Sequence, residues 1–151
     1  LRFPGDNFAP EPEEIDRLVN FHLKENLNGF STNICNVFNS GYPDGIGAEM
    51  FSFKLLEDAW LGNSSSEEKE HVHLNFFNYV SQKEKNSSCL VKTPICPKEI
   101  RRPDLILDVN TKNQFDYAQR LYNDLYSHEK IFGIKDIISW HDNYSNYENK
   151  Q

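Results

Sequence analysis

Apolar residues recur at helical spacing in three stretches of the chain. In residues 11–23 the apolar face includes Ile15, Leu18 and Val19, and it follows prolines and acidic residues that favour a first helical turn. The same spacing occurs in residues 115–125, which follow a Thr-x-x-Gln capping box at Thr111, and again in residues 134–144. These patterns predict three helices.

Two further helices are predicted near the middle of the chain. Residues 54–60 form a short helical pattern, and the serines and glutamates of residues 64–68 contain the spacing of a second capping box. We expect this box to open a helix that continues to about Val80. The polar residues 81–88 are then expected to form a loop.

Short runs of β-prone residues lie between these helices. They occupy residues 30–37, 48–53, 89–92 and 105–109, and residues 1–3 have the character of the end of another strand. Strands that alternate with helices predict an α/β fold with a mostly parallel sheet. Because neither a repeat nor a linker interrupts the chain, we expect a single domain over residues 1–151.

Composition and charge limit the classes of partner. The formal net charge is -7, without Lys/Arg clusters that would neutralise a phosphate backbone, so we expect no nucleic acid partner. No apolar run approaches the roughly 20 residues that span a bilayer, so we expect no membrane partner. The cysteines are odd in number and form no C-x-x-C pair, which favours reduced thiols and a cytoplasmic protein.

Two turns of the sequence contain acidic residues. The β-prone residues 1–3 run into Pro-Gly-Asp, which ends at Asp6, and open α/β sheets bind ligands at the carboxyl ends of their strands. A simple Asx turn at Asp6 is the alternative. Pro-Asp-Gly at residues 43–45 predicts a second sharp turn, and a short strand that contains Glu49 follows it.

Three blocks of residues, taken in order, resemble the cytidylyltransferases, a family that activates sugars as CMP conjugates. The blocks are PGDN at 4–7, YPDG at 42–45 with EMFS at 49–52, and EHV at 70–72 with RRPD at 101–104 and VNT at 109–111. The resemblance covers about residues 2–142. It points to the branch of acylneuraminate cytidylyltransferases and of spore-coat polysaccharide synthesis.

This resemblance implies a fold, a reaction and partners. The implied fold is a Rossmann-like nucleotide-diphospho-sugar transferase sheet flanked by helices, in a homodimer. In the implied reaction a sugar oxygen attacks the α-phosphate of CTP, so that a CMP-sugar for surface polysaccharide biosynthesis forms and pyrophosphate leaves. Mg²⁺ is the implied cofactor, because the charge of the phosphates must be neutralised at the reacting centre.

The resemblance also implies that Asp6 and Asn110 hold the metal and take part in catalysis. Asn110 stands where the family has Asp in a Val-Asp-Thr pattern, and a neutral amide oxygen binds Mg²⁺ less strongly than a carboxylate. Asp108, two positions earlier on the same strand face, could substitute only if it lies near the ligand end of the strand. The alternative is that Asn110 simply precedes the cap at Thr111.

Six further residues match the substrate side of the family by their position in or beside the three blocks: Asp44, Glu49, Lys69, His71, Arg101 and Arg102. For His71 the alternative is packing on a helix face, and for the two arginines it is a solvated loop. His73, His128 and His141 have no metal-ligand spacing, so we expect no zinc site.

The chain departs from the family in one major respect. It contains no glycine- and basic-rich nucleotide loop, and no G-x-x-x-x-G-K-[ST] or G-x-G-x-x-G motif. Because the family carries this loop before the position of Leu1, we expect a C-terminal portion of the domain without its N-terminal strands, inactive in isolation. The alternatives are a noncatalytic sugar-binding or dimerisation module, and an acidic α/β interaction domain.

The aromatic residues give a separate reason to expect a homodimer. The apolar surface of five aromatic residues is larger than a thin sheet is expected to bury: Tyr42, Phe51, Phe53, Phe76 and Phe77. Exposed apolar patches of this kind mark interfaces.

Overall fold

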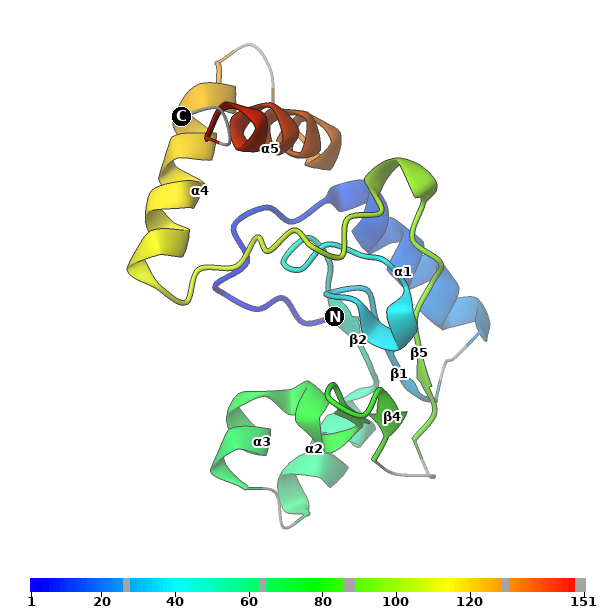
Figure 1. Ribbon diagram of the computed structural model, residues 1–151. Coiled ribbons are helices and arrows are strands. Elements are labelled where there is room, and N and C mark those ends of the chain that lie inside the picture. The colour runs from blue at the N-terminus through cyan, green and yellow to red at the C-terminus, as the bar shows by residue number, and fades with distance from the viewer. Residues whose placement is uncertain (26–27, 63–64, 86–88, 129–130, 149–151) are drawn as a thin grey trace.

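Helices and short strands are mixed along the chain. The computed structural model describes residues 1–25, 28–62, 65–85, 89–128 and 131–148, with side chains through residue 143 (Figure 1). In chain order its elements are α1 (Pro12–Glu25), β1 (Phe30–Thr32), the 3₁₀ helix η1 (Val37–Asn39), β2 (Glu49–Met50), α2 (Phe53–Leu61), α3 (Ser66–Glu70), the 3₁₀ helix η2 (Val72–Asn75), β3 (Phe77–Asn78), β4 (Lys83–Glu84), β5 (Val91–Lys92), the 3₁₀ helix η3 (Lys98–Ile100), α4 (Lys112–Leu125) and α5 (Ile134–Glu148). The protein therefore contains both α-helices and β-strands. The helices predicted at residues 11–23, 54–60, 115–125 and 134–144 are confirmed as α1, α2, α4 and α5.

The main sheet is small and mixed in direction. Its strand order is β2-β1-β5, with β1 parallel to β5 and antiparallel to β2. The first residues of the chain continue the sheet, since Arg2 forms an antiparallel bridge with Glu49 of β2. The prediction of a mostly parallel sheet is wrong for the described residues. The chain between β1 and β2 is a loop with one 3₁₀ turn, which reverses direction without a crossover helix.

Residues 105–109 are extended but pair only through isolated bridges. Asp108 bridges Asn7 in the antiparallel sense, and Ile106 bridges Asp44 in the parallel sense. The predicted strand therefore lies between the N-terminal loop and the turn at residues 42–45. This arrangement brings three acidic segments of the sequence side by side.

The helix predicted from residue 66 to about Val80 is wrong beyond Glu70. His71 has φ -110° and ψ 85°, which ends α3. Asn75 then donates its side-chain amide to the carbonyl oxygens of Glu68 and Val72, at 2.8 and 3.0 Å. The chain continues into a hairpin of β3 and β4 rather than a helix, and part of the expected loop at residues 81–88 is strand β4.

Two apolar clusters form the core. One contains the buried residues Tyr42, Ile46, Cys96, Ile100, Leu105, Leu107, Leu121, Ile134 and Ile137, and it lies beneath α4 and α5. The other contains Phe30, Val37, Phe76, Phe77, Cys89 and Val91, packed against side chains of α2. Figure 1 shows α4 and α5 at one end of the molecule and α2 and α3 at the other.

The aromatic surplus expected from the sequence is mostly absorbed by these clusters. Tyr42, Phe76 and Phe77 are buried and Phe51 is half-buried, whereas Phe53 on α2 is 79% exposed. Of these five residues, Phe53 on α2 is therefore the one that still supports an interface.

Candidate functional site

A pocket of about 480 Å³ collects most of the acidic residues singled out in the sequence. The titratable and amide side chains among its lining residues are Arg2, Asp6, Asn7, Cys35, Asp44, Glu70, His71, His73, Tyr79, Asp108 and Asn110. They come from the N-terminal loop, the turn at residues 42–45, the segment after α3, and the end of the extended residues 105–109. All three blocks of the family resemblance therefore contribute to one pocket.

Backbone hydrogen bonds hold three aspartates on adjacent segments. The amide of Val109 donates to the carbonyl of Asp6 at 3.0 Å, which fixes Asp6 beside Asp108. The amide of Asp44 donates to the carbonyl of Leu105, and the amide of Leu107 donates back to the carbonyl of Asp44, both at 2.9 Å. The three carboxylates approach one pocket because these segments pair.

The turn beside Asp44 requires glycine. Gly45 has φ +92°, and a Cβ at this position would collide with the carbonyl of Leu107. Glycine is thus required at this turn both by the local backbone conformation and by the close approach of the segment that contains Leu107. It lets the backbone pass close to the extended segment that carries Asp108.

Burial, together with neighbouring acids, raises the pKa of Asp44 to about 6. The largest cause is burial, followed by the negative charge of Asp108, while the backbone hydrogen bond from Gly45 acts in the opposite direction. Asp6 adds a smaller repulsion. A bound cation would relieve this accumulation of negative charge.

The oxygen donors of the pocket fit Mg²⁺ only in its nucleotide-bound form. Within the described residues, no three or more His, Cys, Asp or Glu side chains are grouped so that they could enclose a metal ion. Mg²⁺ is commonly held by one or two carboxylates together with phosphate oxygens and water. Asp6 and Asp108 provide two such carboxylates on one pocket.

Asn110 belongs both to the pocket and to the start of α4. Its side-chain amide donates to Asp108 at 2.6 Å, and its backbone amide donates to Oε1 of Gln114 at 2.9 Å. Thr111 caps the helix by accepting from the backbone amide of Gln114. Asn110 thus directly precedes the N-cap residue, and Asp108 lines the same pocket as Asp6 and Asn110.

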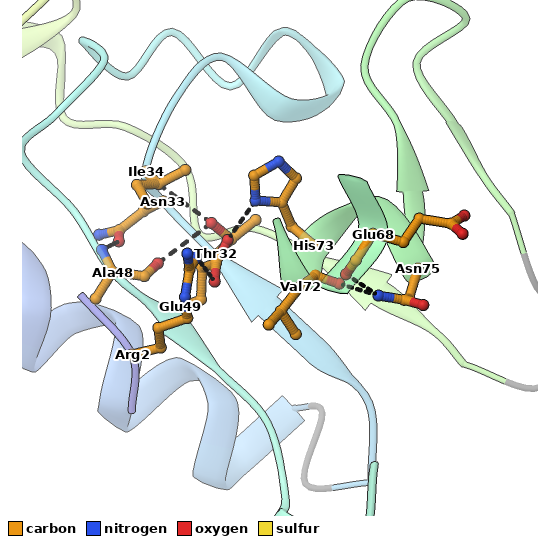
Figure 2. A network of polar contacts seen from close by, with 10 residues as sticks. All are labelled: Arg2, Thr32, Asn33, Ile34, Ala48, Glu49, Glu68, Val72, His73 and Asn75. Atoms are coloured by element: carbon orange, nitrogen blue, oxygen red, sulfur yellow. Dashed lines mark hydrogen bonds and ion pairs between the residues drawn. The ribbon is translucent and has the colours of Figure 1, made fainter. Parts of the chain in front are cut away.

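Glu49 lies behind the pocket rather than on its wall. Its side chain is fully buried, accepts a hydrogen bond from Nη1 of Arg2 at 2.6 Å and is hydrogen-bonded to Nδ1 of His73 at 2.9 Å (Figure 2). Both of these partners line the pocket. Glu49 therefore reaches the pocket through His73 and Arg2 and does not line it itself.

His73 is one of the pocket residues that sequence reasoning missed. It lies 24 positions from Glu49, and no local pattern links the two residues. His71, which was expected on the substrate side, does line the pocket, with its ring centroid 5.7 Å from that of His73. It follows the last residue of α3, so the alternative of packing on a helix face is wrong.

The remaining cationic residues implied by the resemblance lie outside this pocket. The ammonium group of Lys69 lies over the ring of Trp60, 5.2 Å from its centroid. Arg101 donates to the carbonyl of Ser40 at 3.2 Å, and Arg102 pairs with Asp104 and Asp142. Both arginines lie in irregular backbone after η3, where Arg101 is exposed and Arg102 is half-buried, so the solvated-loop alternative describes Arg101 and in part Arg102.

The thiol in the pocket is not an activated nucleophile. Burial, followed by the negative charge of Asp44, raises the pKa of Cys35 to about 12. The pocket therefore offers oxygen and imidazole groups for chemistry.

The chain is similar to one curated protein of unassigned role. No family model matches it, and no solved structure matches it. It is 28% identical over 144 residues to "Uncharacterized protein MJ1063" of Methanocaldococcus jannaschii, an alignment that covers 94% of this chain and 52% of that protein. The chain thus spans about half the length of this curated relative. Among the helices of the described residues, none has the length and apolar character needed to cross a membrane.

Proposed function

We propose that this chain carries part of the Mg²⁺-nucleotide site of a cytidylyltransferase-like protein. The reaction is transfer of the cytidylyl group of CTP to a sugar, which yields a CMP-sugar and pyrophosphate for surface polysaccharide biosynthesis. The observation that carries the proposal is the convergence of Asp6, Asp108 and Asn110 on one pocket. Asp6 and Asn110 come from two separate blocks of the resemblance, which lie about a hundred positions apart in the sequence, and Asp108 directly precedes the second of them.

The finer fold belongs to the same proposal. The parallel pairs of β1 with β5 and of Asp44 with Ile106 are compatible with the C-terminal portion of a Rossmann-like nucleotide-diphospho-sugar transferase sheet. A cytoplasmic location suits the proposed use of CTP and the free cysteines Cys35, Cys89 and Cys96.

Each acidic residue has a defined part in the proposed site. Asp6 and Asp108 would hold Mg²⁺, which when bound neutralises phosphate charge during transfer. Asn110 keeps Asp108 in place through its hydrogen bond. Asp44 is more buried than Asp6 and contributes to the charge of the pocket. His71 lines the pocket, where it can donate a hydrogen bond to an oxygen of the substrate.

Nucleotide titration tests the proposal. Calorimetric titration with CTP is carried out at several Mg²⁺ concentrations for the parent chain and for Asp6→Asn. The matched control is Asp16→Asn, which removes the same charge from an exposed position on α1, away from the pocket. We expect Asp6→Asn to abolish the Mg²⁺ dependence and Asp16→Asn to retain it. Equal behaviour of the two variants would remove Asp6 from the site.

A noncatalytic sugar-binding or dimerisation module is the second candidate. It is favoured by Asn110 at the family's second metal position and by the engagement of Lys69, Arg101 and Arg102 outside the pocket. We expect no release of pyrophosphate from CTP by the 151-residue chain alone, because it contains no matching nucleotide loop. Turnover that disappears in Asp6→Asn would contradict this expectation and establish the enzyme.

A further inference from the structure

A buried carboxylate defines the orientation of one pocket histidine. Glu49 is fully buried, and a buried carboxylate is costly unless it is paired and hydrogen-bonded. Arg2 supplies the opposite charge at 2.6 Å. The Nδ1 atom of His73 lies 2.9 Å from the other carboxylate oxygen of Glu49 and completes the pairing.

This pairing determines which ring nitrogen carries the proton. An ionised carboxylate only accepts hydrogen bonds, so Nδ1 of His73 must be the donor to Glu49. In the neutral ring the other nitrogen, Nε2, then keeps its lone pair. Figure 2 shows Nδ1 turned toward Glu49 and the second nitrogen on the opposite side of the ring.

The surroundings of the ring hold it at the pocket. His73 lines the pocket with a side chain that is 20% exposed. The ring of Tyr79 packs edge-on against it at a centroid distance of 4.9 Å. The 3₁₀ helix η2 carries His73, and the side-chain amide of Asn75 ties this helix back to α3. Within the described residues, no protein group is hydrogen-bonded to Nε2.

We infer that His73 is the proton acceptor of the pocket, positioned by Glu49, and that its Nε2 binds the hydroxyl group of the acceptor substrate. This inference rests on the proposed function for the identity of the reaction. In that reaction the hydroxyl O–H bond breaks as the oxygen bonds to the α-phosphorus of CTP, and the bond from phosphorus to pyrophosphate breaks. The proton moves to Nε2, and Glu49 stabilises the resulting imidazolium.

The arrangement also allows a structural role of His73 to be distinguished from a role as proton acceptor. A structural histidine needs its bond to Glu49 alone, whereas a proton acceptor needs an accessible lone pair on the second nitrogen. His73→Asn distinguishes these roles, because an asparagine amide can donate to Glu49 from nearly the position of Nδ1 and has no equivalent of Nε2.

The test measures the tautomer and the reactivity of the ring. Long-range ¹H–¹⁵N NMR spectra of the parent chain report the tautomer of each histidine, and we expect the Nδ1–H form for His73. Diethyl pyrocarbonate, which acylates unprotonated imidazole nitrogen, is then applied, and the modified histidines are mapped by mass spectrometry. We expect modification of His73 in the parent and in His71→Asn, a stability of His73→Asn in urea close to that of the parent, and several-fold slower modification in Glu49→Gln.

The outcomes are decisive in either direction. An Nε2–H tautomer for His73, or an unmodified His73 beside a modified His71, overturns the inference. The tautomer is read in the parent chain, so it decides even if a variant does not fold. An unchanged rate in Glu49→Gln removes Glu49 as the positioning residue. Protection of His73 by CTP with Mg²⁺ tests the proposed function separately: without protection the nucleotide proposal fails, while a reactive Nδ1–H His73 still stands as the proton acceptor.

Discussion

The side-chain amide nitrogen of Asn110 lies 2.6 Å from a carboxylate oxygen of Asp108 and donates a hydrogen bond to it. Asp108 also accepts from the side chain of Gln114 at 3.2 Å, and Gln114 in turn is the residue that Thr111 caps. The start of α4 and the acidic pocket therefore share one hydrogen-bond network. We therefore expect a change at position 110 to alter both the pocket and the stability of the chain.

Asn110→Asp should tighten Mg²⁺-dependent binding of CTP and weaken the metal-free protein. The new carboxylate replaces the donor to Asp108 with a like charge, which is repulsive without a cation and attractive to Mg²⁺. We expect Mg²⁺-dependent binding to improve by ~1–3 kcal/mol, the range of a charge-assisted contact. Calorimetric titration measures the first effect, and thermal unfolding with and without Mg²⁺ measures the second. Unfolding that is insensitive to Mg²⁺ in this variant would argue against a metal at this position.

Asp44 should make the chain less stable as pH rises from about 4 to about 6. Because the folded state holds the pKa of Asp44 at about 6, above its ordinary value of 3.8, the folded state binds more protons than the unfolded state in this window. The free energy of unfolding therefore falls as pH increases, by at most about 2–3 kcal/mol.

Asp44→Asn tests this pH dependence, since an amide does not ionise. We expect the variant to equal the parent near pH 4 and to be more stable than the parent at pH 7. Urea unfolding at several pH values measures the difference, which isolates Asp44 from other titrating groups. A constant difference across the window would show that Asp44 does not hold the proton.

Glu49→Ala should destabilise the chain strongly. The substitution leaves Arg2 without its partner at 2.6 Å and removes the acceptor of His73, and breaking a buried ion pair on one side costs about 3–5 kcal/mol. Urea unfolding measures the loss. Glu57→Ala is the control, because Glu57 pairs with Lys54 at the surface and should change stability by less than ~1 kcal/mol. Similar losses for both variants would show that the buried network has no special role.

We propose that any homodimer forms through α2. This helix exposes Phe53, Trp60 and Leu61 at 79%, 62% and 74%. Phe53→Ser should weaken self-association at least about tenfold, because burying a phenylalanine contributes about 1.5–3 kcal/mol. Val80→Ser, which changes a residue that is 97% exposed beyond β3, is the matched control. Sedimentation at micromolar concentrations measures both, and a monomeric parent across that range contradicts the dimer.

Elements that depend on neighbouring residues could be predicted from the sequence. The spacing of Ile15, Leu18 and Val19 predicted α1, and the cap at Thr111 predicted the start of α4. Pro-Asp-Gly predicted the turn at Gly45, whose positive φ is a local requirement. Asp6 was found in the same way, because its turn follows a β-prone segment, whereas Asp44 became a site candidate through the family resemblance.

The way in which distant segments combine could not be predicted from the sequence and is seen in the folded molecule. Arg2 and His73 meet Glu49 across 47 and 24 positions, and such contacts leave no periodic signal in the sequence. The end of α3 was missed for the same reason, since burial of Phe77 in the core and the bonds from Asn75 favour a hairpin over continued helix. Strand direction also escaped prediction, because the pairing partner of each short strand is set by packing and not by its own residues.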